Sequence, residues 1–285
     1  MEFSLDQPMR CPAGWGKLMV CTDASDEGQN AVALTLELAR ACDSQVFAVQ
    51  VLQVVPEFQA VAPDLRATLE RGIQENMAVI KAAADQLGVS LKPVMPEGQL
   101  PHAAIVAAAE KIRPDLIIMG RCGKSALARI LMGNVTARVI GHSPVNVLVA
   151  PRGAALAFQR LLVASDGSTY SESAWKLALS MAKQAKSRLI GVAVAPEEGD
   201  IIESQAIIRR MLTTASRAGV HFKGVNPQGV APDTGIIQQA IKNEVDLIIV
   251  GSHGRTGLKK LLVGSVTERV IGGSPCPILV VKQPA

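Results

Sequence analysis

The stretch that decides the fold is Leu247–Thr267, which reads LIIVGSHG, then RTGLKKLLV, then GSVT. Its first four residues are apolar and predict a buried strand that ends at Val250. Glycines in the loop let backbone N–H groups approach an anion without an intervening Cβ. A helix that begins at Ser265 adds unpaired N–H donors and the positive end of its dipole. Strand, glycine loop and helix N-terminus in this order predict a phosphate-binding loop.

The same stretch occurs earlier in altered form, because the chain contains an internal repeat. Segments 115–150 and 246–281 are identical at 19 of 36 positions. Matching residues are 143 positions apart near the start of the copies and 131 apart after Gly88, since the first copy holds 12 additional residues between Leu52 and Gly88. The repeat predicts an N-terminal extension (1–16), a first copy (17–151) and a second copy (160–282).

Each copy alternates strands with helices. In the second copy we expect strands at Arg160–Ser165, Leu189–Ala195, Val220–Val225, Val245–Val250 and Pro277–Val281. We expect helices after an N-cap at Ser168 or Thr169 and at Ile201–Gly219, Asp233–Asn243 and Ser265–Gly272. Continuously apolar strands that alternate with helices predict an α/β fold, with two tandem five-stranded parallel sheets, each covered on both faces in three layers.

Composition excludes some partners. Only 3% of the residues are aromatic, which argues against a stacking surface for nucleic acid, so no nucleic-acid partner is expected. Residues 1–150 carry 13 Lys and Arg against 15 Asp and Glu, whereas residues 151–285 carry 16 against 10. The basic excess therefore lies in the copy with the more complete glycine motif.

The five cysteines include no Cys-x-x-Cys pair, so neither a zinc site nor a redox motif is predicted, and reduced thiols are expected. The first residues lack the apolar core of a secretory signal. No apolar run approaches the roughly 18 residues of a membrane helix. These features favour a cytoplasmic protein with no membrane contact.

Candidate site residues follow the predicted strands. Asp166 ends the first strand of its copy, where it could cap the next helix, bind a ribose hydroxyl or hold Mg²⁺. Parallel sheets bind ligands at the carboxyl ends of their strands, so Asp166 and Gly251 could face one crevice. The segment Ser265–Glu268 has a capping-box pattern, which indicates either a stable helix start or phosphate ligands. No second group is arranged to activate His253, so no catalytic residue is predicted.

Basic residues also lie between the glycine pairs of the second copy. Arg255, Lys259 and Lys260 could form a solvated face or could steer phosphate charge.

At these residues the chain resembles the universal stress protein family in its tandem two-domain form. Its nucleotide-binding members carry a Gly-x2-Gly-x9-Gly-Ser/Thr pattern, which is matched by Gly251, Gly254, Gly264 and Ser265. Asp166 matches an Asp at the end of their first strand, and Val194 matches a valine beside the adenine. The resemblance implies a Rossmann-like fold, similar to the adenine nucleotide alpha hydrolases. It further implies a stress-responsive regulator that binds ATP or AMP with Mg²⁺, which Asp166 would hold together with the phosphates.

The cofactor-binding residues predicted in the second copy are Ala164, Ser165, Asp166, Val194, Gly251, His253, Gly254, Gly264, Ser265, Val266 and Thr267. Their counterparts in the first copy are Thr22, Asp23, Val51, Gly120, Gly123, Gly133, Asn134, Val135 and Thr136. The first copy departs from the family pattern at Asn134, where Ser or Thr is expected. Asn caps helices as well as Ser does, so the helix start should survive. Our hypothesis is that the second copy binds ATP well and the first binds it weakly or not at all.

The resemblance also implies that the domains pair through their last strands, here Ile278–Val281 with Val147–Val149, within one chain. A homodimer and a protein partner of unknown identity are further expectations. Two alternatives remain open: a slow ATPase or nucleotidyl-type transferase on the same fold, and a scaffold for protein partners with vestigial sites. The lack of a positioned general base argues against fast hydrolysis. The intact Gly264-Ser265 pair argues against a vestigial site in the second copy.

Overall fold

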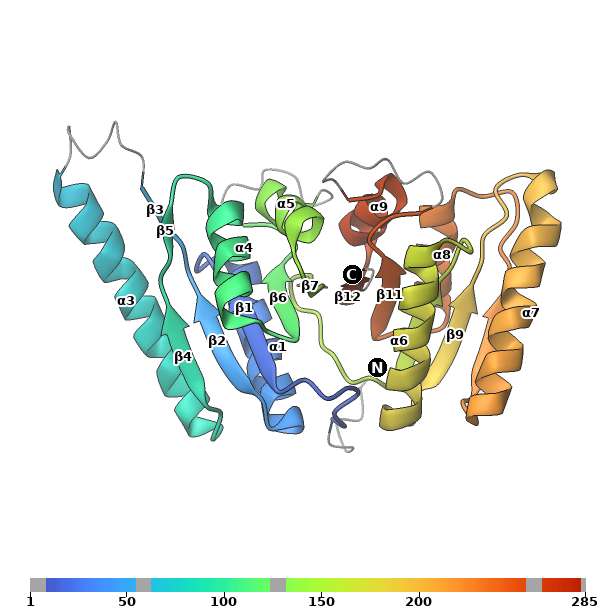
Figure 1. Ribbon diagram of the computed structural model, residues 1–285, viewed down its shortest axis with the longest axis horizontal. Coiled ribbons are helices and arrows are strands. Elements are labelled where there is room, and N and C mark those ends of the chain that lie inside the picture. The colour runs from blue at the N-terminus through green and yellow to red at the C-terminus, as the bar shows by residue number, and fades with distance from the viewer. Residues whose placement is uncertain (1–8, 55–62, 124–131, 255–262, 283–285) are drawn as a thin grey trace.

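The two copies share a single ten-stranded sheet (Figure 1). The structure is a computed structural model that describes residues 9–54, 63–123, 132–254 and 263–282. The strand order is β10-β9-β8-β11-β12-β7-β6-β1-β2-β4, and a separate short sheet pairs β3 with β5. Strands within each copy run parallel, whereas β12 and β7 meet antiparallel at the centre.

The strands are β1 (Lys17–Cys21), β2 (Gln45–Val49), β3 (Leu52–Gln53), β4 (Leu91–Val94), β5 (Glu97–Gly98), β6 (Leu116–Gly120), β7 (Asn146–Ala150), β8 (Arg160–Ala164), β9 (Arg188–Val192), β10 (Phe222–Val225), β11 (Leu247–Gly251) and β12 (Ile278–Val281). The helices are α1 (Asp26–Cys42), α3 (Pro63–Gln86), α4 (Pro101–Ile112), α5 (Asn134–His142), α6 (Thr169–Ala185), α7 (Ile201–Ala218), α8 (Pro232–Lys242) and α9 (Ser265–Gly273), with a short 3₁₀ turn, η1 (Glu198–Asp200), before α7. The predicted strand and helix order is confirmed, with boundaries shifted by up to three residues.

The seam between the copies is the predicted pairing of last strands. Ile278 lies opposite Val149, Leu279 opposite Leu148, and Val280 opposite Val147. All the residues of β12, and of β7 beyond its first residue, are buried. The pairing within one chain is therefore confirmed, and it makes the core continuous across both copies.

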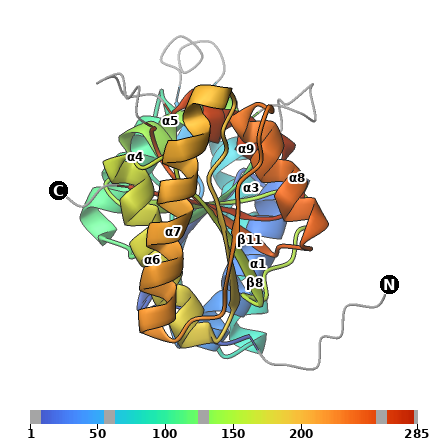
Figure 2. The same ribbon diagram turned by 90° about the vertical axis from the view of Figure 1, so that its right-hand side faces the viewer.

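Helices cover both faces of the sheet, as the apolar strands predicted. Alternate strand residues point to opposite faces, so Leu18 and Val20 pack in one core cluster while Met19 packs in the other. Helices α1, α3, α6 and α7 cover the first face, and α4, α5, α8 and α9 cover the second. Figure 2 shows this arrangement for the second copy, with α6 and α7 on one side of the strands and α8 and α9 on the other.

Local signals in the sequence account for several helix ends. The Ser168 side chain accepts the Ser171 N–H at 3.3 Å, which confirms Ser168 as the N-cap of α6. Gly219 ends α7 with φ 70°, a conformation that favours glycine, so the predicted C-cap is also confirmed. Helix α3 of the first copy corresponds to α7 of the second. Part of the first copy's additional sequence lengthens α3, which has 24 residues where α7 has 18.

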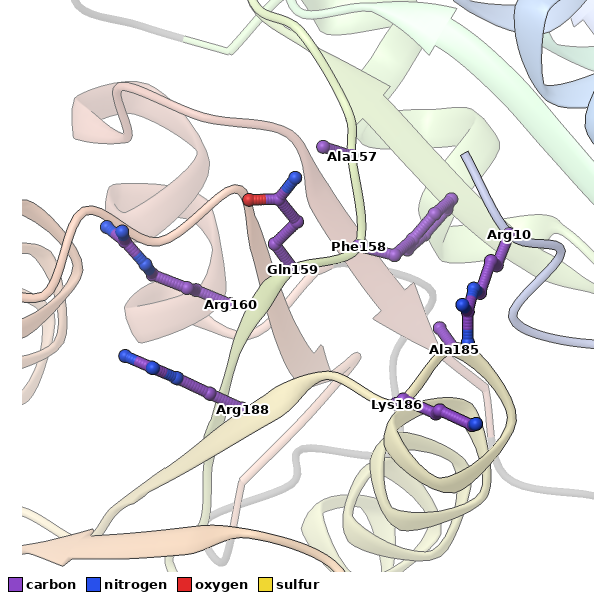
Figure 3. A pocket seen from close by; sticks show the side chains of 8 residues that line it. All are labelled: Arg10, Ala157, Phe158, Gln159, Arg160, Ala185, Lys186 and Arg188. Carbon is purple, nitrogen blue, oxygen red and sulfur yellow. The ribbon is translucent and has the colours of Figure 1, made fainter. Parts of the chain in front are cut away.

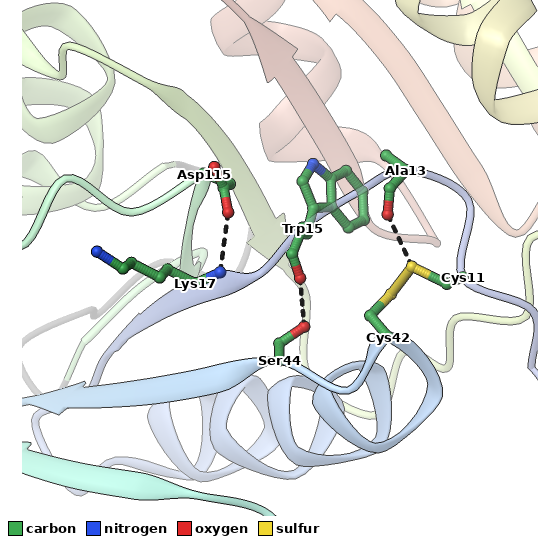
Figure 4. The surroundings of a disulfide bond; sticks show 7 residues. All are labelled: Cys11, Ala13, Trp15, Lys17, Cys42, Ser44 and Asp115. Atoms are coloured by element: carbon green, nitrogen blue, oxygen red, sulfur yellow. Dashed lines mark hydrogen bonds between the residues drawn. A yellow bond between two sulfur atoms is a disulfide. The ribbon is translucent and has the colours of Figure 1, made fainter.

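The expectation that all cysteines are reduced is wrong for one pair. Cys11 and Cys42 form a disulfide across a sequence separation of 31, which joins the N-terminal segment to the end of α1 (Figure 4). Local motifs such as Cys-x-x-Cys cannot reveal a pair that only the fold brings together. Burial raises the pKa of Cys21 to about 12 and that of Cys276 to about 11, so these thiols stay protonated at neutral pH. Among the described helices, none has the length and apolar character needed to cross a membrane.

Candidate functional site

The second glycine loop (251–265) meets Asp166 at the carboxyl edge of the sheet. Asp166 follows β8, and β11, which ends at Gly251, is the neighbouring strand. The Ser168 N–H donates to Asp166 Oδ1 at 3.0 Å and fixes the carboxylate. A Cβ at Gly254 would lie 2.7 Å from Asp166 Oδ2. The structure therefore brings Asp166 and Gly254 together, and it leaves no space for a side chain at position 254.

The other two glycines of the motif allow close backbone contacts within the protein. A Cβ at Gly251 would lie 2.8 Å from the carbonyl carbon of Tyr170, so this glycine lets the first turn of α6 approach β11. The Gly264 N–H donates to the Ser252 carbonyl at 3.0 Å, and a Cβ at Gly264 would lie 3.3 Å from His253 Cα. These two glycines therefore shape the loop itself, in addition to letting an anion approach the backbone.

Helix α9 begins without a side-chain cap. Gly264 is the N-cap residue, with φ −61° and ψ 141°, and among the described residues no side chain caps the first-turn N–H groups. The predicted capping box is therefore wrong: Ser265 is the first residue inside the helix and is exposed. The Thr267 hydroxyl donates to the Gly251 carbonyl at 2.9 Å and ties the helix to the strand end. Within the described chain, the first turn of α9 thus lacks the cap that Ser168 supplies to α6.

The first copy repeats this arrangement. Gly133 is the N-cap of α5, again without a side-chain bond from the described residues, so Asn134 does not cap the helix as expected. Its side-chain oxygen accepts instead from Arg138 Nε at 3.0 Å. The Thr136 hydroxyl donates to the Gly120 carbonyl at 3.0 Å, as Thr267 does in the second copy.

His253 has an aromatic neighbour. Its ring centroid lies 5.0 Å from that of Tyr170, at an interplanar angle of 44°. Its Nδ1 lies 3.1 Å from the hydroxyl of Ser252. The first turn of α6 therefore places an aromatic ring beside His253 in the Gly-x2-Gly segment.

The remaining predicted residues of the second copy support the edge of the sheet. Buried Ser165 shares a hydrogen bond of 3.0 Å with the Ser171 hydroxyl, and half-buried Ala164 ends β8. Val194 lies beyond β9 and packs against α8, since a Cβ at Gly235 would lie 3.0 Å from Val194 Cγ2. Val194 is thus separated from the glycine loop by β8 in the strand order. Val266 is half-buried beside Ser265.

The first glycine loop (120–134) contains a carboxylate of the chain itself. Glu27, in the first turn of α1, accepts the backbone N–H of Cys122 at the centre of the Gly-x2-Gly segment. Arg121 Nη2 lies 3.9 Å from the same carboxylate, and the two side chains are only 14% and 16% exposed. A carboxylate that is paired with Arg121 therefore lies against the Gly-x2-Gly segment of the first copy.

Arg121 also reaches the second copy. Its Nη1 donates to the carbonyl of Gly272 in the last turn of α9 at 3.0 Å. The two glycine loops are thus connected through α9, which starts at one of them and is held by a side chain of the other.

The rest of the first site keeps the common frame. The Asp23 carboxylate accepts the Ser25 N–H at 3.0 Å, and a Cβ at Gly123 would lie 2.5 Å from Asp23 Oδ2. The Thr22 hydroxyl accepts the Ala24 N–H at 3.1 Å. Val51 is half-buried and Val135 is exposed.

Glu27, Arg121 and Tyr170 were not predicted from the sequence. A signal was present, since the repeat aligns Glu27 with Tyr170 and Cys122 with His253. The acid and the ring that differ between the copies therefore both lie beside the glycine loops. Arg255, Lys259 and Lys260 lie outside the described residues.

Three comparisons place the chain among known proteins. The family model described as "Universal stress protein family" matches residues 14–151 and 157–282. A universal stress protein of Methanocaldococcus jannaschii is 34% identical over 143 residues, which is 45% of this chain and 84% of the relative. One of Mycolicibacterium smegmatis is 25% identical over 291 residues, covering 93% of this chain and 96% of the relative. The crystal structure of a universal stress protein from Archaeoglobus fulgidus superimposes with a TM-score of 0.78 at 22% identity, covering 95% of this chain and 100% of that one.

Proposed function

Because the chain belongs to the universal stress protein family, we propose that it is a stress-responsive regulatory protein that binds ATP or AMP, mainly in its second copy, with little or slow hydrolysis. One observation carries the proposal. The first turn of α9, which no described side chain caps, follows a glycine loop whose Gly254 lies against the Asp166 carboxylate. Unpaired N–H groups at a helix start bind phosphate oxygens well.

The second site offers a group for each part of the nucleotide. The exposed Ser265 hydroxyl and the N–H groups of Val266 and Thr267 would hold phosphate oxygens. Asp166 would bind a ribose hydroxyl, or Mg²⁺ together with the phosphates. Within the described ranges no three His, Cys, Asp or Glu side chains converge on one point, so the phosphates would supply most ligands of such an ion. Val194 would contact the adenine.

Glu27 supports the weaker role proposed for the first copy. Its carboxylate takes the Cys122 N–H that a phosphate would otherwise accept. It also lies 3.9 Å from Arg121 Nη2, so it occupies both a backbone donor and the neighbouring cation that a phosphate would need. Tyr170 has no such charge at the equivalent place in the second copy.

The test identifies the ligand and then removes its site. Small molecules released by denaturing the purified protein are identified by mass spectrometry, and ATP, AMP and cyclic AMP are titrated calorimetrically. We expect an adenine nucleotide in the extract and one strong site per chain. Ser265→Asp should weaken ATP binding at least about tenfold through charge repulsion, while it stabilises α9 because an acid in the first turn favours a helix. Loss of binding without loss of stability therefore cannot be attributed to unfolding.

Asp166→Asn is the second variant, since its amide oxygen can still accept the Ser168 N–H. We expect weaker nucleotide binding with unchanged folding. Absence of any adenine nucleotide binding at millimolar ATP would refute the proposal and favour the scaffold alternative. Rapid accumulation of ADP during the titration would favour the ATPase.

A further inference from the structure

A basic pocket lies at the end of the second copy opposite the glycine loop. It has a volume of about 390 Å³ and is lined by Arg10, Phe158, Gln159, Arg160, Lys186 and Arg188, among others (Figure 3). Arg160 and Arg188 are the first residues of β8 and β9, whereas the glycine loops follow the carboxyl ends of their strands. The pocket and the proposed nucleotide site therefore lie at opposite ends of the strands.

Cations dominate this pocket. Arg160 and Arg188 lie opposite one another in the register of two neighbouring parallel strands, and Figure 3 shows their side chains extending in the same direction. Arg160 forms an ion pair with Glu244. In the described part of the chain, no carboxylate lies within ion-pair distance of Arg10, Lys186 or Arg188. Among the described residues these three positive charges thus remain without an acidic partner.

The fold does not require these cations. The repeat aligns Arg160, Lys186 and Arg188 with Lys17, Asp43 and Gln45 of the first copy. Lys186 and Asp43 are both C-cap residues in the left-handed backbone conformation, with φ 58° and 53°. The same backbone therefore carries three positive charges in one copy and, in the other, one positive charge, one negative charge and a neutral amide. The basic cluster is specific to the second copy.

We propose that this pocket binds a compact small molecule with at least two oxyanion groups, phosphate or carboxylate. A guanidinium group can bind either a phosphate or a carboxylate through two parallel hydrogen bonds. The volume of the pocket lies within the usual range of small-molecule sites. Arg160 and Arg188 lie on one side of the pocket and Arg10 and Lys186 on the other (Figure 3), so the positive charge is spread over the site and suits a ligand with more than one charged group. Arg10 reaches the pocket from the N-terminal segment, which the adjacent Cys11 attaches to α1 of the first copy. The N-terminal segment and the second copy therefore both contribute to the site.

The test uses pyrophosphate and citrate as probes in calorimetric titrations of the full chain, so the two arms distinguish phosphate from carboxylate ligands. Arg188→Gln and Lys186→Asp introduce the residues that the first copy carries on the same backbone, so both should fold. We expect saturable binding by the wild type, about tenfold weaker binding by Arg188→Gln and a larger loss for Lys186→Asp. The control is Lys176→Gln, an exposed cation ten positions earlier on α6 and about 15 Å away along its axis.

Two further variants distinguish this pocket from the glycine loop and from the N-terminal segment as the place of binding. Ser265→Asp should leave binding of the probe intact, and loss of all pyrophosphate binding in that variant would overturn the proposal in favour of the glycine loop. The double change Cys11→Ser, Cys42→Ser should weaken binding less than Arg188→Gln does, because it releases Arg10 only. Equal affinities for Arg188→Gln and Lys176→Gln, or no saturable binding of either probe at millimolar concentration, would also overturn it.

Discussion

The two glycine loops share a frame of Asp and Thr contacts, and they differ in the side chain that lies beside this frame. In both, an Asp carboxylate lies close to the second glycine, and a threonine hydroxyl bonds the carbonyl of the first. Beside this frame the first copy places the acid Glu27, and the second copy places the ring of Tyr170. The comparison separates the residues that form the loop from those that we propose decide whether an anion can enter it.

The largest expected difference between the copies concerns the disulfide, which only the first copy has. The repeat aligns Cys42 with Ala185, so no equivalent bond exists in the second copy. Closing a loop with a sequence separation of 31 should stabilise the fold by about 3.5 kcal/mol in the chain-entropy model. Urea unfolding should show this loss for Cys11→Ser, Cys42→Ser. The reduced wild type should match that variant, and a reduced wild type as stable as the oxidised one would contradict the prediction.

The next difference concerns the aspartate that accepts backbone N–H groups at the start of the first strand of each copy. Asp246 accepts the N–H groups of Gln159 and Arg160, and Asp115 accepts that of Lys17. Burial raises the pKa of Asp246 from 3.8 to about 6. A raised folded pKa means that protonation stabilises the fold. The contribution is complete below pH 3.8 and is lost as the pH rises through 6.

Asp246→Asn should remove this dependence. The stability of the wild type relative to the variant should rise by up to about 3 kcal/mol as the pH falls from about 7 to about 4. Urea unfolding at several pH values measures this difference, with Asp115→Asn as the matched reference in the first copy. A constant difference across that range would refute the assignment.

Transferring the acid tests the role of Glu27. Tyr170→Glu places a carboxylate in the first turn of α6, beside the second glycine loop. We expect ATP to bind about 30-fold more weakly, because the loop loses an N–H donor and gains a repulsive charge. Tyr170→Phe keeps the ring and should bind nearly as well as the wild type. Equal losses in the two variants would assign the effect to the tyrosine hydroxyl instead.

The reverse exchange has the smallest expected effect. Glu27→Gln with Asn134→Ser should strengthen ATP binding in the first copy by about tenfold, because it removes the carboxylate and restores the hydroxyl. Calorimetric stoichiometry should then approach two nucleotides per chain. Asn134→Ser alone should change it less, since Glu27 still occupies the loop. An unchanged stoichiometry in the double variant would show that other features close this site.

The sequence predicted the architecture well because its signals are local or periodic. Apolar strands, the serine cap of α6 and the repeat itself can all be read without coordinates. Ser265 shows where such signals fail, since a pattern of Ser and Glu three residues apart cannot tell the cap position from the first helical residue. The Glu27 contact and the Cys11–Cys42 bond join residues that are far apart in the chain, so only the fold reveals them. Asp166 and Gly251 were predicted to face one crevice because parallel strands end at the same edge, and the structure places them at the ends of the neighbouring strands β8 and β11.

The antiparallel pairing of β7 with β12 has a consequence for how the molecule can be divided. Edge strands offer unpaired backbone groups to other chains, and proteins often protect them with Lys or Pro. The outer strands follow this rule, since β4 reads LKPV and β10 reads FKGV. The central strands, NVLVA and ILVV, have no such protection. A single copy expressed alone would therefore expose an apolar edge strand that is prone to association. In the duplicated chain β7 and β12 cover each other at any protein concentration.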